Sequence, residues 1–423
     1  TGSYNVAIGF DSLSTEDEHG RNIAIGYNTL NALNAGTDGN NVAIGHSAGQ
    51  VMSTGVQNTI IGANAGDALT TGSHNIAMGY GALSAEDTGS RNVAIGKATL
   101  FNQNYDGSAY NVAIGYEAGA NVSTGTNNTL VGGLAGDALT TANGNTAVGY
   151  FALSSEDTGG RAVAVGQGAL KLQNGGGTTS TYNTAVGFEA GKATTTGLYN
   201  TLIGGQAALA LTTGSQNVAL GRQALYTEDT GGRNIAIGDR ALYDANYDGS
   251  GYNVAIGHDA GDDISTGIKN TIIGGNAAKT NITTGSNNIV IGYAATAAAA
   301  DSANSVTFGD SNIASIRCQV QTISALSDER DKTNIQDSTY GLDYINSLRP
   351  VTFEWNNREE SVHKGTKDVG FIAQELQKID DEYTKLVLTD NPERLEASYA
   401  RLIPVLVKAI QELSEEVKQL KNK

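Results

Sequence analysis

The chain is poor in several residue types on which folded domains commonly depend. Cys318 is the single cysteine among its 423 residues, which excludes a disulfide within the chain. Proline occurs three times, and aromatic residues make up only 6% of the sequence. Because few large side chains are available to fill an interior, the composition favours an elongated repeat structure with a thin core.

Basic residues are also scarce, since 26 Lys and Arg stand against 43 Asp and Glu, which gives a net charge of −17. An acidic surface without a basic stripe disfavours nucleic acid and anionic membranes as partners. No apolar run approaches the length of a membrane helix, and no signal peptide is recognisable, so membrane insertion is not expected. The five histidines are scattered, and we expect neither a metal nor a cofactor.

A five-residue motif dominates the first three quarters of the chain. It reads NVAIG at its first copy, and its usual step is 17 residues. The copies begin at Asn5, Asn22, Asn41, Asn58, Asn75, Asn92, Asn111, Asn128, Asn145, Ala162, Asn183, Asn200, Asn217, Asn234, Asn253, Asn270, Asn288 and Ser305. Eighteen copies in one register predict stacked coils, each of which buries its apolar face against its neighbours.

The alternation within the motif predicts which side chains face inward. Val6 and Ile8 alternate with Ala7 at the period of a strand, and we place Val6 and Ile8 inside the coil, with Ala7 against a neighbouring surface. The final glycine permits a tight turn, and the leading asparagine is expected to bond through its side-chain amide to the asparagines above and below it. A second apolar position, such as Leu69, predicts a second short strand, so that one coil contains two strands and two turns.

A disordered stalk rich in Gly, Ser and Thr is the alternative, since 55 glycines would permit it. Linkers keep no register of apolar residues, however, whereas this chain keeps one over about residues 1–309. Over that range the run NVAIGxxAG resembles the head repeat of YadA-like trimeric adhesins. The resemblance implies a mainly β fold, a left-handed parallel β-roll, and a homotrimer with three rolls side by side.

Four coils form a larger unit of 70 to 72 residues, and the first coil of each unit carries an acidic turn followed by an arginine. These residues are Glu16, Asp17, Arg21, Glu86, Asp87, Arg91, Glu156, Asp157, Arg161, Glu228, Asp229 and Arg233. We expect surface Asp–Arg pairs rather than metal sites, because neither EF-hand nor GGxGxD spacing is present. Paired carboxylates also occur in glycosidases, but a fourfold repetition in a turn indicates a structural role.

The second coil of each unit carries an insertion, such as FNQNYDGSAY or YDANYDGSGY. The candidate receptor-binding residues of these two insertions are Tyr105, Asp106, Tyr110, Tyr247, Asp248 and Tyr252. Tyrosine rings stack on sugars, and Asp side chains accept hydrogen bonds from hydroxyl groups, so the insertions indicate a glycan-binding surface. A solvated turn that accommodates the extra residues is the alternative.

After a last strand at Val306–Phe308 the sequence changes character. Residues 310–326 alternate apolar and polar side chains, which predicts a β connector. Three ordered motifs follow: SDERDK from Ser327, GFIAQEL from Gly370, and the final stretch YARLIPVLVKAIQELSEEVKQLKNK. Together they resemble the intramolecular chaperone auto-processing domain, or peptidase S74 domain, of phage tail fibres and tailspikes. The resemblance implies a small α+β domain over residues 327–423 that drives trimerisation.

The resemblance also implies cleavage of the chain before Ser327, at the Leu326–Ser327 bond. A serine hydroxyl can attack the preceding carbonyl through a five-membered ring, and a positioned, desolvated lysine can take its proton. By resemblance, Ser327 and Lys332 form this catalytic dyad in a single-turnover reaction, and no turnover enzyme is expected. Asp331 stands where the family often has Leu. From the residues alone, a capped helix start or a surface turn is the favoured interpretation of the pair, and the neighbouring motifs reverse that preference.

The end of the chain, about residues 396–423, predicts a helix with an apolar seam. Its members step by three and four residues: Ile403, Leu406, Ile410, Leu413, Val417 and Leu420. This is the heptad spacing of a coiled coil, and Pro404 is tolerated in the first turn. We expect a trimeric coiled coil, with an amphipathic helix folded on its own domain as the alternative.

These features predict the distal part of a phage tail fibre, located on the virion outside the host cell. A trimeric shaft or tip would bind a host cell-surface glycan or protein receptor, and the chaperone would cleave itself off. A bacterial trimeric autotransporter adhesin is the alternative, but it needs a membrane anchor of amphipathic strands where this chain has a charged helix. A glycan-cleaving tailspike would need a non-repeating acidic cluster. Because the sequence starts inside a repeat without Met, we expect a virion attachment module upstream.

Overall fold

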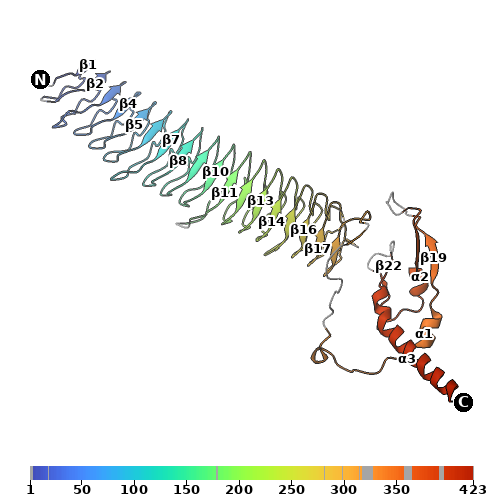
Figure 1. Ribbon diagram of the computed structural model, residues 1–423. Helices are drawn as coiled ribbons and strands as arrows, with labels where there is room; N and C mark the ends of the chain where they lie inside the picture. Colours follow the sequence, from blue (N-terminus) through green and yellow to red (C-terminus); the bar gives the residue numbers. More distant parts are fainter. Residues whose placement is uncertain are drawn as a thin grey trace. The chain divides into compact units, whose positions relative to one another are not determined.

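The computed structural model describes residues 3–17, 19–177, 180–280, 282–297, 299–313, 315–316, 327–356, 364–389 and 395–422. The chain forms two compact units, Thr1–Phe308 and Gly309–Lys423. Figure 1 shows the first unit as a long stack of coils and the second as a small domain of helices and strands. Most of the predicted β connector, residues 317–326 and 314, lies outside the described residues.

Each coil of the first unit contributes one three-residue strand to a single parallel sheet. The strands are β1 (Val6–Ile8), β2 (Ile23–Ile25), β3 (Val42–Ile44), β4 (Thr59–Ile61), β5 (Ile76–Met78), β6 (Val93–Ile95), β7 (Val112–Ile114), β8 (Thr129–Val131), β9 (Thr146–Val148), β10 (Val163–Val165), β11 (Thr184–Val186), β12 (Thr201–Ile203), β13 (Val218–Leu220), β14 (Ile235–Ile237), β15 (Val254–Ile256), β16 (Thr271–Ile273), β17 (Ile289–Ile291) and β18 (Val306–Phe308). Consecutive strands pair in register, as Ala43 does with Ala24 and Ile60. The predicted parallel β-solenoid is confirmed. The second strand predicted around Leu69 is wrong, because that buried leucine lies in an irregular return segment.

The strand residues face the opposite way from the prediction. In β3 the middle residue Ala43 is fully buried, whereas Val42 and Ile44 are only half-buried, and every strand from β2 to β17 buries its middle residue in this way. The placement of Val6 and Ile8 inside the coil, with Ala7 outside, is therefore wrong. Leucines from the return segment fill the thin interior. In most coils the strand therefore contributes only the methyl group of its middle alanine to the core.

Asparagine and glycine hold successive coils together. The Asn58 backbone N–H donates to the side-chain oxygen of Asn41 at 2.9 Å, and its side-chain amide donates to the carbonyl of Gly72 at 2.9 Å. The predicted bond from the side-chain amide to the next asparagine also forms, at 3.3 Å between Asn58 and Asn41, but the backbone N–H is the main donor between asparagines. Gly45 ends β3 at φ +136°, and a Cβ there would lie 2.6 Å from the carbonyl oxygen of Gly62. Any side chain at this position would therefore force the coils apart.

The second unit contains short helices, two small antiparallel sheets and one long helix. Its elements are η1 (Glu329–Asp331), α1 (Leu342–Ser347), β19 (Val351–Glu354), β20 (Lys367–Gly370), α2 (Ala373–Leu376), β21 (Val387–Leu388), β22 (Glu396–Ala397), η2 (Tyr399–Arg401) and α3 (Leu402–Lys421). β19 pairs with β20, and β21 with β22. The long helix therefore begins six residues later than predicted, because its expected first turn forms β22 and η2 instead. Among the described residues, no helix is both long and apolar enough to span a membrane.

Candidate functional site

Ser327 and Lys332 lie side by side, as the dyad requires. The Lys332 ammonium group donates to the Ser327 hydroxyl oxygen at 2.6 Å and to the Ser327 carbonyl oxygen at 3.1 Å. This is the distance over which a serine proton can pass to a neutral amine. Both side chains are exposed to solvent, and Leu326 lies outside the described residues.

A capped turn produces this geometry. The Asp328 carboxylate accepts a hydrogen bond from the Arg330 backbone N–H at 2.9 Å and pairs with the Arg330 guanidinium at 2.6 Å, which lowers the pKa of Asp328. The Lys332 N–H then donates to the Glu329 carbonyl at 3.0 Å. This contact closes η1 and brings the Lys332 side chain back over Ser327. The segment therefore forms the capped helix start that was the alternative to a dyad. The same turn also gives Ser327 and Lys332 the geometry for proton transfer.

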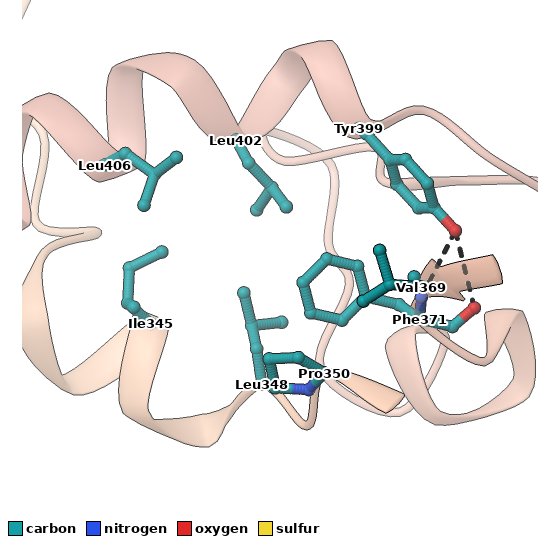
Figure 2. A pocket seen from close by; sticks show the side chains of 9 residues that line it. Ile345, Leu348, Pro350, Val369, Phe371, Tyr399, Leu402 and Leu406 are labelled. Atoms are coloured by element: carbon teal, nitrogen blue, oxygen red, sulfur yellow. Dashed lines mark hydrogen bonds between the residues drawn. The ribbon is translucent and has the colours of Figure 1, made fainter. Parts of the chain in front are cut away.

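Beyond the dyad, the C-terminal unit has an apolar groove of about 460 Å³ (Figure 2). It is lined by Ile345, Leu348, Pro350, Val369, Gly370, Phe371, Tyr399, Leu402 and Leu406. At one end the Tyr399 hydroxyl accepts a hydrogen bond from the Phe371 N–H at 3.2 Å. At the other end Leu406 also belongs to the predicted heptad seam, so the groove and the seam form one continuous apolar surface.

The insertions place their candidate receptor residues in different environments. Asp106 and Asp248 are exposed and accept hydrogen bonds from the hydroxyls of Thr88 and Thr230 at 2.7 and 2.9 Å. Tyr105 is half-buried. Although the two insertions are equivalent, they lie eight coils apart and are not brought together.

Tyr110 and Tyr252 are exposed, at 53% and 51%, and lie beside arginines of the preceding coil. The guanidinium carbon of Arg91 is 5.7 Å from the Tyr110 ring centre, and that of Arg233 is 5.6 Å from the Tyr252 ring centre. These contacts have the geometry of cation–π pairs. The arginines were expected to pair with Asp, and their stacking on tyrosines was missed.

Tyr247 is buried at 7% exposure, and its hydroxyl contacts the side chains of Asn234 and Asn253 inside the coil. Its proposed contact with a receptor is therefore wrong, because the ring fills the core. The structural cause is the neighbouring Gly251, since a Cβ at that position would collide with the Tyr247 ring.

The acidic turns bury one of their carboxylates. Glu86, Glu156 and Glu228 are fully buried, and each accepts a hydrogen bond of 2.6–2.7 Å from the backbone N–H of the glycine three residues later. Among the described residues, Arg91 and its equivalents Arg161 and Arg233 form no ion pair. The predicted surface Asp–Arg pairs are therefore wrong in these three units. Arg21 does pair, at 3.0 Å, but with Asp38 of the following coil. The Glu-x-x-Gly spacing in the sequence could have predicted these buried glutamates, whose carboxylates cap the turn.

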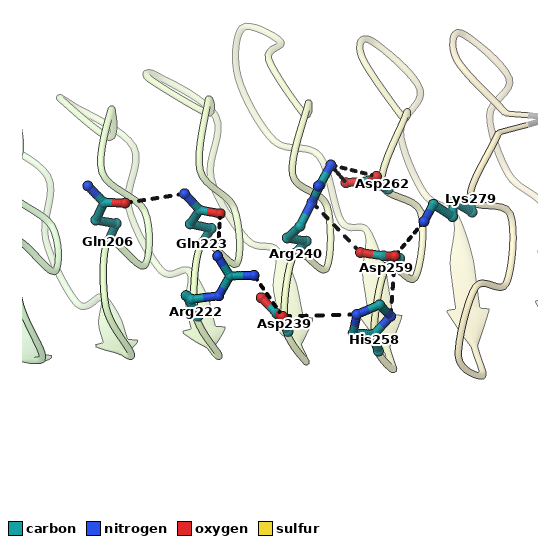
Figure 3. Close-up of polar contacts among 9 residues, drawn as sticks. All are labelled: Gln206, Arg222, Gln223, Asp239, Arg240, His258, Asp259, Asp262 and Lys279. Atoms are coloured by element: carbon teal, nitrogen blue, oxygen red, sulfur yellow. Dashed lines mark hydrogen bonds and ion pairs between the residues drawn. The ribbon is translucent and has the colours of Figure 1, made fainter.

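A network of ion pairs crosses the later coils (Figure 3). Arg240 binds both oxygens of Asp262, at 3.0 and 3.2 Å, and lies 3.7 Å from Asp259, which also pairs with Lys279 at 2.5 Å. Burial is the main cause of the raised pKa of Asp262, and the Arg240 charge opposes it. In the described part of the chain, no group of His, Cys, Asp and Glu is arranged to hold a metal ion.

Comparisons with known proteins identify the C-terminal unit. Residues 327–388 match the family described as chaperone of endosialidase, a range that starts at Ser327. The chain is 36% identical over 99 residues to the long tail fiber protein Gp37 of Enterobacteria phage M1 and, equally, to that of Enterobacteria phage Ox2. The matched segment covers 23% of this chain and 39% of each relative. No solved structure matches the chain. The chain thus carries a chaperone-of-endosialidase domain after its β-solenoid, and a 99-residue segment of it is homologous to part of phage long tail fibre proteins.

Proposed function

We propose that this chain is the distal part of a phage tail fibre, in which three β-solenoids attach the virion to the host surface. The chaperone domain assembles the trimer and then cleaves itself off before Ser327. The observation that carries the proposal is the chaperone family match directly behind an 18-coil solenoid. Similarity to tail fibre proteins supports the same assignment.

The exposed face of the long sheet supports a homotrimer. Each coil presents two strand residues outward, and these are mostly Val, Ile and Leu, with exposures such as 37% for Ile114 and 43% for Leu220. Contiguous apolar surface of this extent is unusual on a monomeric protein and indicates an interaction face. Further copies of the chain would cover it, because none of these positions carries a charged side chain, although six of the outward strand residues are threonines.

Helix α3 supports the trimer independently, because it has two apolar faces. Leu402, Val405 and Ala409 are buried against their own domain, at 5–6% exposure. The heptad seam beside them is open, with Ile403 at 61% and Ile410 at 65%. The packing of the helix on its own domain therefore leaves a complete seam for two other helices.

A C-terminal trimeriser would solve a problem that repeats create. Near-identical coils can pair with a neighbouring chain out of register at little energetic cost. A domain that joins three chains at one end fixes the register before the solenoids associate. Cleavage afterwards removes the template, which leaves the assembled fibre kinetically stable.

Attachment would use side chains that stay exposed on the coils. Asp106, Asp248, Tyr110 and Tyr252 remain candidate contacts for a host glycan or protein receptor. Tyr105 can contribute at most an edge of its half-buried ring.

The test is the molar mass of the intact chain by light scattering, with two matched variants of α3. Wild type and Gln411→Lys, which changes an exposed position beside the seam, should be trimers. Ile410→Lys places a charge in the seam and should lower the trimer fraction strongly. A wild-type monomer, or equal behaviour of the two variants, would contradict assembly through this helix.

A further inference from the structure

We propose that a row of exposed aromatic rings along one corner of the solenoid binds an extended, neutral glycan. The row lies at the residue directly after the glycine that ends each strand. Tyr80, Tyr116, Tyr150 and Phe188 occupy this position after β5, β7, β9 and β11. The proposal rests on the function as a host-attachment fibre, and it places a ligand surface outside the insertions.

The exposure and spacing of the rings fit such a ligand. The four rings are 49–57% exposed and lie on alternate coils. Because adjacent strands are ~4.8 Å apart, successive rings repeat every ~9.6 Å along the stack. This is close to the length of two sugar units in an extended β-linked chain. Each ring could therefore stack against every second sugar of one polymer.

The coils between the rings supply polar groups and room. Lys97 and Gln167 are exposed at the intervening positions, and the Lys97 ammonium lies 5.3 Å from the centre of the Tyr116 ring. Gly133 occupies the third such position, where a Cβ would lie 3.4 Å from the edge of the Tyr150 ring. Two hydrogen-bonding side chains and one glycine thus alternate with the rings. The side chains can bind the hydroxyl groups of a glycan, while the aromatic rings stack on the faces of its sugars.

The later coils show that the fold does not need aromatic rings at this corner. Arg222, Asp239 and His258 occupy the same position after β13, β14 and β15, where they take part in the ion-pair network of Figure 3. Their strands and glycine turns match those of the earlier coils. In the first three coils, Phe10, Tyr27 and His46 occupy this position and stack on one another. Since ion pairs or stacked rings serve the corner elsewhere, a ligand would account for the rings after β5, β7, β9 and β11, which lie on alternate coils.

Charge and ring geometry narrow the ligand class. With a net charge of −17, the protein would repel an acidic polymer, which favours a neutral one. Not every exposed tyrosine fits the pattern: Tyr182 and Tyr199 stack on each other at 5.6 Å with planes 9° apart, so no sugar can enter between them. This pair provides a control within the same chain.

The test measures binding of cellohexaose, a neutral extended oligosaccharide, to the full chain by titration calorimetry. We expect a dissociation constant of about 1 mM, and affinities at least about tenfold lower for maltohexaose, which curls, and for hexagalacturonate, which is acidic. The double variant Tyr80→Ser/Tyr116→Ser should lose at least about tenfold in affinity for cellohexaose. The control variant Tyr182→Ser/Tyr199→Ser removes two equally exposed rings and should bind as wild type.

Three results would overturn the proposal: no binding of cellohexaose by wild type, no preference among the three sugars, or equal loss in both double variants. If Tyr80→Ser/Tyr116→Ser loses its trimeric mass, the row is a contact between subunits and the proposal fails as well. None of these results bears on the tail-fibre assignment, which is tested separately through α3.

Discussion

In the coil of β15, the side-chain amide of Asn253 donates a hydrogen bond to the hydroxyl oxygen of Tyr247 at 3.3 Å. In the coil of β7, the equivalent Asn111 donates instead to the side-chain oxygen of Gln103 at 2.9 Å. Ala245 stands where Gln103 would be, and the Tyr247 ring turns inward to fill that space. One insertion motif, NYDGS, thus has two packings, which the neighbouring residues select.

Gly251→Ala is expected to destabilise the solenoid, because the new Cβ would collide with the buried Tyr247 ring. Overpacking of this kind costs about 1–3 kcal/mol in the free energy of unfolding, measured here by urea denaturation. Ala109→Gly makes the reverse change at the equivalent position, where no ring is buried, and should cost less than about 1 kcal/mol. Equal effects of the two changes would mean that Tyr247 leaves the core freely.

Glu228 should make stability depend on pH. Burial, together with the charge of Asp229, raises the pKa of Glu228 to about 7, although the Gly231 N–H opposes the shift. Since the folded form binds the proton more tightly than the unfolded chain, the contribution to stability is complete below about pH 4.5. It is lost as the pH rises through about 7. Melting temperatures at pH 5 and pH 8 should therefore differ, with the higher value at pH 5.

Glu228→Gln should raise the melting temperature at pH 8 and flatten its pH dependence between 4.5 and 7. The matched control is Glu156→Gln, because Glu156 accepts a hydrogen bond from the Gln173 amide at 3.1 Å, a partner that Glu228 lacks. Replacing that carboxylate removes a charge-assisted acceptor and should not stabilise the protein. The interpretation fails if both variants gain equally at pH 8.

The repeat register could be read from the sequence, but the direction of the strand side chains could not. In Val42, Ala43 and Ile44, the alternation is satisfied with either the outer pair or the middle residue inside. The choice depends on what covers the outer face. The structure leaves Val42 and Ile44 on an open sheet face, and in our proposal other copies of the chain cover it. A rule that places larger apolar residues inside therefore fails for a coil that has apolar partners on both sides.

The candidate sites also differ in how far the sequence could predict them. The Ser327–Lys332 contact depends on one local turn, and the resemblance of the surrounding motifs to the chaperone family, rather than the spacing alone, predicted the proximity. The burial of Tyr247 depends on Ala245 and Gly251, which differ from Gln103 and Ala109 at the equivalent positions. A comparison of the two units in the sequence shows these smaller residues. Only the packing in the structure shows that the Tyr247 ring fills the space they leave.

The two arginines of the ion-pair network should differ in importance. Arg240→Met leaves the nearly buried carboxylates of Asp262 and Asp259 without their shared guanidinium and should cost about 1–3 kcal/mol. Arg222→Met removes a single pair with Asp239, in which the arginine is 60% exposed, and should cost less than about 1 kcal/mol. Urea denaturation in low salt gives both values. A larger effect of Arg222→Met would show that burial does not set the strength of these pairs.

The last prediction concerns the dyad. In our proposal the Ser327 oxygen attacks the Leu326 carbonyl carbon while Lys332 takes the hydroxyl proton. Lys332 then passes this proton to the Ser327 nitrogen as the peptide C–N bond breaks, and water hydrolyses the resulting ester. Ser327→Ala removes the attacking oxygen and should give an uncut trimer. Lys332→Ala should also remain mostly uncut, with some slow cleavage, because water can replace a base but not the nucleophile. Lys332→Arg should be uncut as well, since a guanidinium stays protonated.

Denaturing electrophoresis separates the intact chain from a fragment that starts at residue 327, and light scattering reports whether each variant is still a trimer. Ser338→Ala changes another exposed serine of the same domain and should cut as wild type. Because the dyad is exposed in the single chain, burial of Lys332 between three copies would favour its neutral form and make cutting depend on assembly. Cleavage should therefore fall with the trimer fraction in Ile410→Lys. A free fragment from Ser327→Ala would disprove the dyad, and a failure of that variant to fold would mean that Ser327 is structural.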